Sequence, residues 1–240
     1  IGQQSGGWTI SWQGTGNTNN DFPGATSILD GIRAQVTAAG GSVIRSMDEG
    51  DPDAVIYVFG ETPYAEGVGD IESLAWQQRS KQDLAQINKF RAAGHKVVAI
   101  FLSGRPMWVN AEINASNAFI AAWLPGSEGQ GVADVLLRNP EGSIQYPFAG
   151  RLSMAWPRFD LNAEDHNLPV EDALFPIGFG ADAAEAANVT DLPVEAVGVL
   201  STSDEILFAG GVRDPWILYL SDEVDPARAA GPGNARSAAG

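Results

Sequence analysis

The carboxylates best placed for chemistry lie in a glycine-rich loop at residues 61–70. Three acids, Glu61, Glu66 and Asp70, share this loop with one tyrosine. A carboxyl group can donate a proton to a reacting atom and later take one back. Glu66 lies between two small residues, and we take it as the candidate for such work. A solvated acidic loop explains the same pattern, and the spacing alone leaves both interpretations open.

Two tryptophans, Trp8 and Trp12, lie in the glycine-rich stretch 6–14. An exposed indole is a flat apolar face suited to stacking on a sugar ring, so both are candidates for substrate binding. Packing against the core is the alternative, and we expect it for at least one of the pair.

Other reactive groups are scarce in this chain. It has no cysteine and two histidines, His95 and His166. One histidine follows a predicted helix and the other lies in a predicted loop, and no Gly-x-Ser-x-Gly nucleophile motif is present. The sequence therefore predicts no metal site and no cofactor. Carboxylates and indoles remain, and together they are typical of sites that act on glycosides.

The loop at 61–70 follows an uncharged run at 54–59 that is rich in β-branched and aromatic residues. Such a run is typical of a strand covered on both faces, here the first central strand. Open α/β sheets bind ligands beyond the carboxyl ends of their strands. The candidate loop is expected at such an end.

Hydrophobic periodicity predicts alternating strands and helices along most of the chain. Helices are expected at 23–39, 80–93 and 132–137, and strands at 42–44, 54–59, 96–102, 117–124 and 150–157. This alternation predicts an α/β fold with a mostly parallel sheet between helix layers. After residue 180 the pattern changes, and short strands are expected at 196–200, 205–209 and 215–219.

Four segments follow from this pattern. Residues 1–20 form a linker and tryptophan-bearing loop, 21–180 the α/β domain with the candidate acid, 181–226 the start of a β-rich domain, and 227–240 a flexible tail.

Two further loops at strand ends carry distinctive residues. Arg105 lies in the loop at 103–106, and we expect it to form a structural ion pair rather than bind a ligand. The turn at 125–131 has three glycines but also Glu128, which argues against a bound phosphate. Its backbone amides are expected to bind a hydroxyl or a neighbouring loop.

Composition excludes several classes of function. The formal net charge is −16, from 30 acids and 14 bases, so nucleic acid would be repelled. No apolar run approaches the roughly 18 residues that a membrane span needs. No leader is visible and the first residue is isoleucine, so we expect a piece of a longer or processed protein.

Five ordered motifs, covering about residues 5 to 180, resemble family 3 glycoside hydrolases, and most closely their β-glucan exohydrolases. They are GGWTISWQG at 6–14, GETPYAEGVGD at 60–70, LSGRP at 102–106, AAWLPGSEGQG at 121–131 and FPIGFG at 175–180. Jointly these motifs are specific, although each alone is not.

The resemblance implies a three-layer α/β/α sandwich that packs against a preceding (β/α) barrel. It implies that the family's general acid/base falls on Glu66 and that Trp12 falls on an aromatic of the leaving-group subsite. It also implies that the nucleophile is an aspartate of the barrel, to which no stretch of this chain corresponds. The tail beyond Val194 resembles the start of an additional β-sandwich of some bacterial members.

From this resemblance we expect the acid/base-bearing domain of a retaining, exo-acting β-glucosidase, inactive by itself and secreted or periplasmic. Its expected partners are a β-glucan or β-glucoside substrate and the barrel of the same protein. Two alternatives stay open: a non-catalytic carbohydrate-binding module that uses Trp8 and Trp12, and a β-xylosidase of the same family.

Overall fold

The computed structural model describes residues 1–77, 80–160, 173–180, 189 and 191–195. Its helices are α1 (Gly2–Ser5), α2 (Ile28–Ala38), α3 (Gln82–Ala92), α4 (Asn110–Ala115) and α5 (Gly129–Leu136), with 3-10 turns η1 (Asn19–Asp21) and η2 (Met47–Glu49). Its strands are β1 (Ala54–Gly60), β2 (Lys96–Leu102), β3 (Ala118–Ala121), β4 (Trp156–Pro157) and β5 (Ala173–Phe175).

The described residues all belong to a unit that spans Ile1–Val199, and a second unit spans Leu200–Gly240. The strands expected at 196–200, 205–209 and 215–219, the tail at 227–240 and His166 lie outside the described residues, as does most of the β-rich segment 181–226. No helix within the described part is both long and apolar enough to cross a bilayer.

The main sheet has the strand order β1-β2-β3, and both pairs of neighbours are parallel. The middle strand, β2, is the continuous apolar run, and five of its seven residues are buried. Parallel strands need crossover connections, which α3 and α4 supply in turn. The predicted α/β class with a parallel sheet is therefore confirmed.

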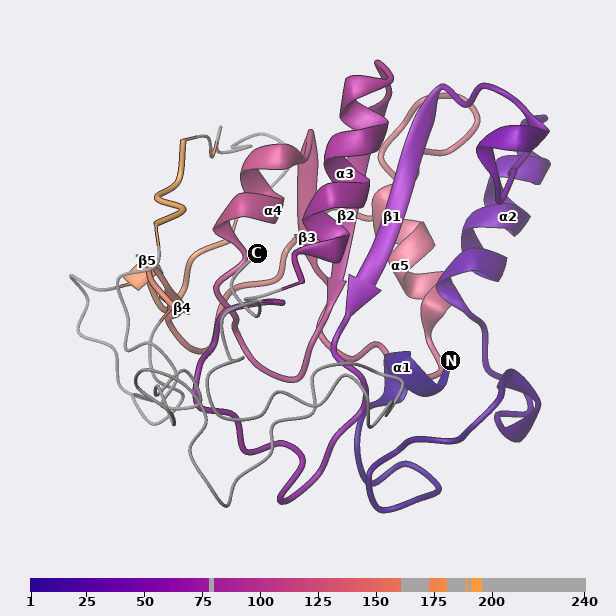
Figure 1. Ribbon diagram of the computed structural model, residues 1–240. Helices are drawn as coiled ribbons and strands as arrows, with labels where there is room; N and C mark the ends of the chain where they lie inside the picture. Colours follow the sequence, from indigo (N-terminus) through magenta and orange to yellow (C-terminus); the bar gives the residue numbers. More distant parts are fainter. Residues whose placement is uncertain (78–79, 161–172, 181–188, 190, 196–240) are drawn as a thin grey trace, which may run out of the picture. The chain divides into compact units, whose positions relative to one another are not determined.

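Helices cover both faces of this sheet (Figure 1). Successive side chains of β2 point to opposite faces. Val97, Ala99 and Phe101 pack with residues of α3 and α4, whereas Ile100 and Leu102 pack with residues of α2 and α5. The sheet thus lies between two helical layers, as the predicted three-layer sandwich requires.

Helix α2 begins later than the periodicity suggests, at Ile28 rather than residue 23. Ser27 caps it, because its hydroxyl accepts a hydrogen bond of 3.1 Å from the backbone amide of Asp30. Gly31 lets α2 approach α5 closely, since a Cβ there would lie 2.9 Å from the Cα of Gln130.

Two strand predictions are wrong in detail. Residues 42–44 form no strand in the described structure, and the strand predicted at 150–157 is reduced to β4. Because nothing pairs with the second side of β1 in the described part, β1 is an edge strand rather than a central one. Phe59 is the one buried residue of β1 and Val58 is 39% exposed, so β1 is less buried than expected, although Val55 and Ile56 pack against the core clusters on opposite faces of the sheet.

Helix α4 buries a carboxylate that the candidate site does not use. Glu112 is 1% exposed, and neither of its carboxyl oxygens has a hydrogen-bond partner among the described residues. Burial raises the pKa of Glu112 above its ordinary value of 4.5, and the charge of Asp83 raises it further while Lys81 opposes the shift.

This raised pKa makes the stability of the domain depend on pH. Protonated Glu112 is tolerated in the core, and its contribution to stability is fully present below the pKa that Glu112 has in the unfolded chain. This contribution is lost as pH rises through the higher pKa of Glu112 in the folded chain. We expect Glu112→Gln to match the native chain near pH 4 and to be more stable at pH 7, because the amide carries no charge that must be buried. Urea unfolding at both pH values measures this, and equal differences at the two values would contradict it.

Candidate functional site

The loops that follow β1 and β2 lie side by side at the carboxyl end of the sheet. The backbone amide of Glu61 donates to the carbonyl of Leu102, at 2.9 Å, so the two loops leave the sheet together. Arg105 then pairs with Glu61, with 2.8 Å between Nη2 and Oε1. The predicted structural ion pair of Arg105 is confirmed.

Arg105 connects the two ends of the loop at 61–70. Its Nε donates to Glu61 Oε1 at 2.9 Å, and its Nη1 donates to the carbonyl of Gly69 at 2.6 Å. Ser103 completes the group, because its hydroxyl donates to Glu61 Oε2 at 2.6 Å. The side chains of Arg105 and Glu61 are only 19% and 11% exposed. Glu61 is thus occupied by structural contacts and is not available for acid–base work.

Tyr64 packs against the same arginine. The guanidinium carbon of Arg105 lies 4.1 Å from the centre of the Tyr64 ring, a cation–π contact. Burial and the carboxylate of Glu61 raise the pKa of Tyr64 to about 12, so its hydroxyl stays protonated at neutral pH. Gly104 provides the space for this ring, since a Cβ there would lie 2.9 Å from the Tyr64 hydroxyl.

Glu66 lies at the outer part of this loop and is exposed. Its carboxylate has no hydrogen-bond or ion-pair partner within the described ranges of the chain. Its backbone is held, because its carbonyl accepts a hydrogen bond of 3.1 Å from Gln13 Nε2. The position of Glu66 therefore agrees with the hypothesis of an unpaired carboxyl group beyond the carboxyl end of β1.

Trp8 and Trp12 form a pair on a tight hairpin. The amide of Trp8 donates to the carbonyl of Trp12 at 2.9 Å, and the ring centroids are 4.3 Å apart with 46° between the planes. The indoles are 59% and 56% exposed, so our expectation that at least one packs in the core is wrong. Trp8 and Ile10 have φ values of 62° and 63°, a strained conformation for such residues. Strain of this kind is typical of functional sites.

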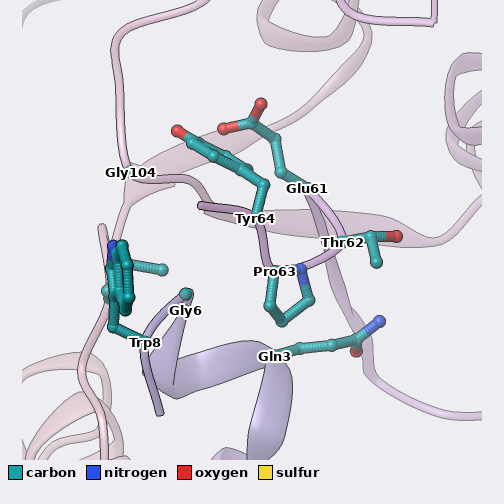
Figure 2. Close-up of a pocket in the computed structure, with 10 residues that line it drawn as sticks. Gln3, Gly6, Trp8, Glu61, Thr62, Pro63, Tyr64 and Gly104 are labelled. Carbon is teal, nitrogen blue, oxygen red and sulfur yellow. The ribbon is translucent and has the colours of Figure 1, made fainter. Parts of the chain in front are cut away.

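The hairpin lies against the loop at 61–70. Gly7 makes this possible, because a Cβ there would lie 1.9 Å from the carbonyl oxygen of Tyr64. A cavity of about 250 Å³ opens between the two segments, lined by Gln3, Gly6, Gly7, Trp8, Glu61, Thr62, Pro63, Tyr64, Gly104 and Leu124. Figure 2 shows Trp8 on one side of it and the residues from Glu61 to Tyr64 on another. Trp12 and Glu66 are not among its lining residues.

The glycine-rich turn at 125–131 binds a neighbouring loop, one of the two outcomes expected. The amide of Gly129 at the start of α5 donates to the carbonyl of Thr26 at 3.0 Å, and the amide of Thr26 donates to the carbonyl of Ser127 at 2.9 Å.

The described residues contain no cluster of three or more His, Asp or Glu side chains placed to hold a metal ion. His95 is at a structural position, with its Nε2 3.7 Å from Asp51 Oδ1.

Sequence analysis missed Gln13, which joins the hairpin to the Glu66 turn. The two segments are about fifty residues apart, and no local pattern indicates which backbone groups an amide side chain will contact. The one available sign was its place directly after Trp12, in a loop already singled out.

The chain is similar to a family of known proteins. A family model described as the glycosyl hydrolase family 3 C-terminal domain matches residues 1–183. The crystal structure of an exo-1,3/1,4-β-glucanase from a Pseudoalteromonas species is 49% identical, with a TM-score of 0.76, over 81% of this chain and 25% of that one.

Two curated relatives are more distant. A lysosomal β-glucosidase of Dictyostelium discoideum is 32% identical over 174 residues, which cover 64% of this chain. A xylan 1,4-β-xylosidase of Xylanibacter ruminicola is 28% identical over 194 residues, which cover 67%. The chain spans 20% and 22% of the length of these two relatives.

Proposed function

Because the chain belongs to the family of glycosyl hydrolase family 3 C-terminal domains, we propose that it is the acid/base half of a retaining, exo-acting β-glucosidase. The substrate is a β-glucan or β-glucoside, from which terminal glucose is released. Glu66 is the general acid/base, and Trp8 and Trp12 stack on the sugar. The nucleophile is an aspartate of an N-terminal (β/α) barrel in the same protein.

The observation that carries this proposal is the place of Glu66. It is an exposed carboxyl without a partner in the described part of the chain. A second acid of the same loop, Glu61, is largely buried and pairs with Arg105. The tryptophan hairpin contacts the same loop through Gln13. A free acid on a loop that is joined to a hairpin with exposed indoles suits the hydrolysis of a glycoside.

The mechanism divides the work between the two domains. The barrel aspartate attacks the anomeric carbon, and Glu66 gives its proton to the departing glycosidic oxygen. Glu66 then takes a proton from the water that hydrolyses the glycosyl-enzyme. Retention requires the two carboxyl groups to lie about 5 Å apart, so the barrel must dock against the loop at 61–70.

This division predicts that the 240-residue chain alone has no glucosidase activity. Without a nucleophile no glycosyl-enzyme forms, and the isolated domain is expected to release no glucose above the uncatalysed rate. Incubation with dinitrophenyl β-glucoside and with a β-linked glucose disaccharide measures this, with the longer protein that carries the barrel as the positive control. Full turnover by the isolated chain would refute the proposal.

The exposure of both indoles also favours a second candidate, a carbohydrate-binding module without catalysis. The same preparations distinguish the two by titration with the disaccharide. In a binding module Trp12→Ala removes affinity and Glu66→Gln changes nothing measurable. In the proposed enzyme, Glu66→Gln in the longer protein removes turnover.

A further inference from the structure

The side chain of Gln13 makes two hydrogen bonds to the backbone that carries Glu66. Its Oε1 accepts from the amide of Ala65 at 2.6 Å, and its Nε2 donates to the carbonyl of Glu66 at 3.1 Å. One contacted peptide group precedes Ala65 and the other follows Glu66, so the two bonds bracket the residue that carries the carboxyl. A planar amide bound at both of its ends in this way fixes the direction of the backbone between them, much as a neighbouring strand would.

The hairpin backbone next to Gln13 is held by close packing and by hydrogen bonds. The residue that follows it, Gly14, is buried against the backbone of Gly6, where a Cβ would lie 2.1 Å from the Gly6 carbonyl oxygen. Asn17 Nδ2 donates to the carbonyls of both Gly14 and Thr9, at 3.1 and 3.2 Å. The hairpin that carries the two tryptophans is thereby closed on itself, and Gln13 projects from it to the neighbouring loop.

Two backbone hydrogen bonds close the turn that carries Glu66. The amide of Gly69 donates to the carbonyl of Ala65 at 2.8 Å, and the amide of Asp70 donates to the carbonyl of Gly67 at 3.1 Å. On the preceding side, the partner of the Ala65 amide is Gln13. Ala65 is only 7% exposed, so loss of Gln13 would leave a backbone donor without a partner in a place with little water.

We propose that Gln13 is a positioning residue that sets the place of the Glu66 carboxyl relative to the tryptophan hairpin. The inference rests on the proposed function of Glu66. Through Gln13 the hairpin and the turn behave as one body, so a sugar that stacks on the indoles meets the acid at a fixed distance. General acid catalysis is sensitive to such placement, because a displacement of about 1 Å can cost roughly 10²-fold in rate.

Two substrates with different leaving groups distinguish a positioning role of Gln13 from a merely structural role. A dinitrophenolate leaves without a proton, whereas the alcohol of a glucose disaccharide needs one. The kinetic constant kcat/KM covers the steps up to formation of the glycosyl-enzyme, in which the acid acts. A misplaced acid therefore lowers kcat/KM for the disaccharide only, whereas damage to the fold or to sugar binding lowers it for both substrates.

The experiment uses the longer protein with its barrel and compares Gln13→Ala with Gln86→Ala, a glutamine on the exposed face of α3. For Gln13→Ala we expect kcat/KM for the disaccharide to fall about 10- to 100-fold, and kcat/KM for dinitrophenyl β-glucoside to fall less than about threefold. Gln13→Glu retains an acceptor for the Ala65 amide and loses the donor to the Glu66 carbonyl, so its loss should be intermediate. Gln86→Ala should change neither constant.

The outcomes are decided by the ratio of the two losses. Equal losses on both substrates, or no loss on either, would overturn the positioning role. If Gln13→Ala fails to fold, as judged by its thermal unfolding, Gln13→Glu carries the same comparison. Glu66→Ala in the same assay separates the two inferences: if it loses activity on the disaccharide selectively and Gln13→Ala does not, the positioning role fails while the proposed function stands.

Discussion

Replacing Glu66 by alanine in the longer protein is expected to lower kcat/KM for a β-linked glucose disaccharide by about 10²–10⁴-fold, the usual contribution of general acid–base catalysis. The same change should leave kcat/KM for dinitrophenyl β-glucoside nearly unaltered, because that leaving group departs without a proton. The turnover number on the activated substrate should still fall, since hydrolysis of the glycosyl-enzyme needs Glu66 as the base. Steady-state kinetics on the two substrates, with the pH profile of kcat/KM, measure all three effects.

The loop itself supplies the matched comparison for this prediction. Asp70 is a second exposed carboxylate four residues after Glu66, and Glu49 is an exposed glutamate in η2, before the start of β1. Asp70→Ala tests which acid of the loop transfers the proton, and Glu49→Ala tests for a general effect of lost charge. A selective loss on the disaccharide in Asp70→Ala, with none in Glu66→Ala, would move the acid/base role to Asp70.

The candidate site was predictable to the level of its loops, because each follows a hydrophobic strand. The run at 96–102 has no polar residue after Lys96, so a buried strand was the simple interpretation, and the loop at 103–106 had to lie at its carboxyl end. The position of β1 at an edge was not predictable. Its residues are as apolar as those of β2, but no strand forms at 42–44 within the described residues, and β1 is less buried than β2.

The contact partners of the site residues could not be predicted from the sequence, for a different reason. A structural ion pair could be expected for Arg105, but thirty acids compete as partners, and only the parallel register of β1 and β2 brings Glu61 beside it. The exposure of the two indoles was also missed. Large aromatic side chains usually gain free energy by burial, whereas here both rings are exposed, on a hairpin in which Trp8 and Ile10 have positive φ values.

The second large effect concerns the stability of the loop at 61–70. Arg105→Met is expected to destabilise the domain by about 3–5 kcal/mol, because it leaves the carboxylate of Glu61 buried without its counter-charge. The variant also loses the hydrogen bond to the Gly69 carbonyl and the contact with the Tyr64 ring. Urea unfolding of the 240-residue chain at pH 7 measures the change in the free energy of unfolding.

Two controls tie this loss to burial of the pair. Arg33 and Asp30 form an ion pair at 2.9 Å on α2, with side chains 41% and 57% exposed, so Arg33→Met should cost less than about 1 kcal/mol. Arg105→Met combined with Glu61→Gln should be less destabilised than the sum of the single variants, because no unpaired buried charge remains. A small loss in Arg105→Met, similar to that of Arg33→Met, would mean that water reaches Glu61 and that the loop is held by other contacts.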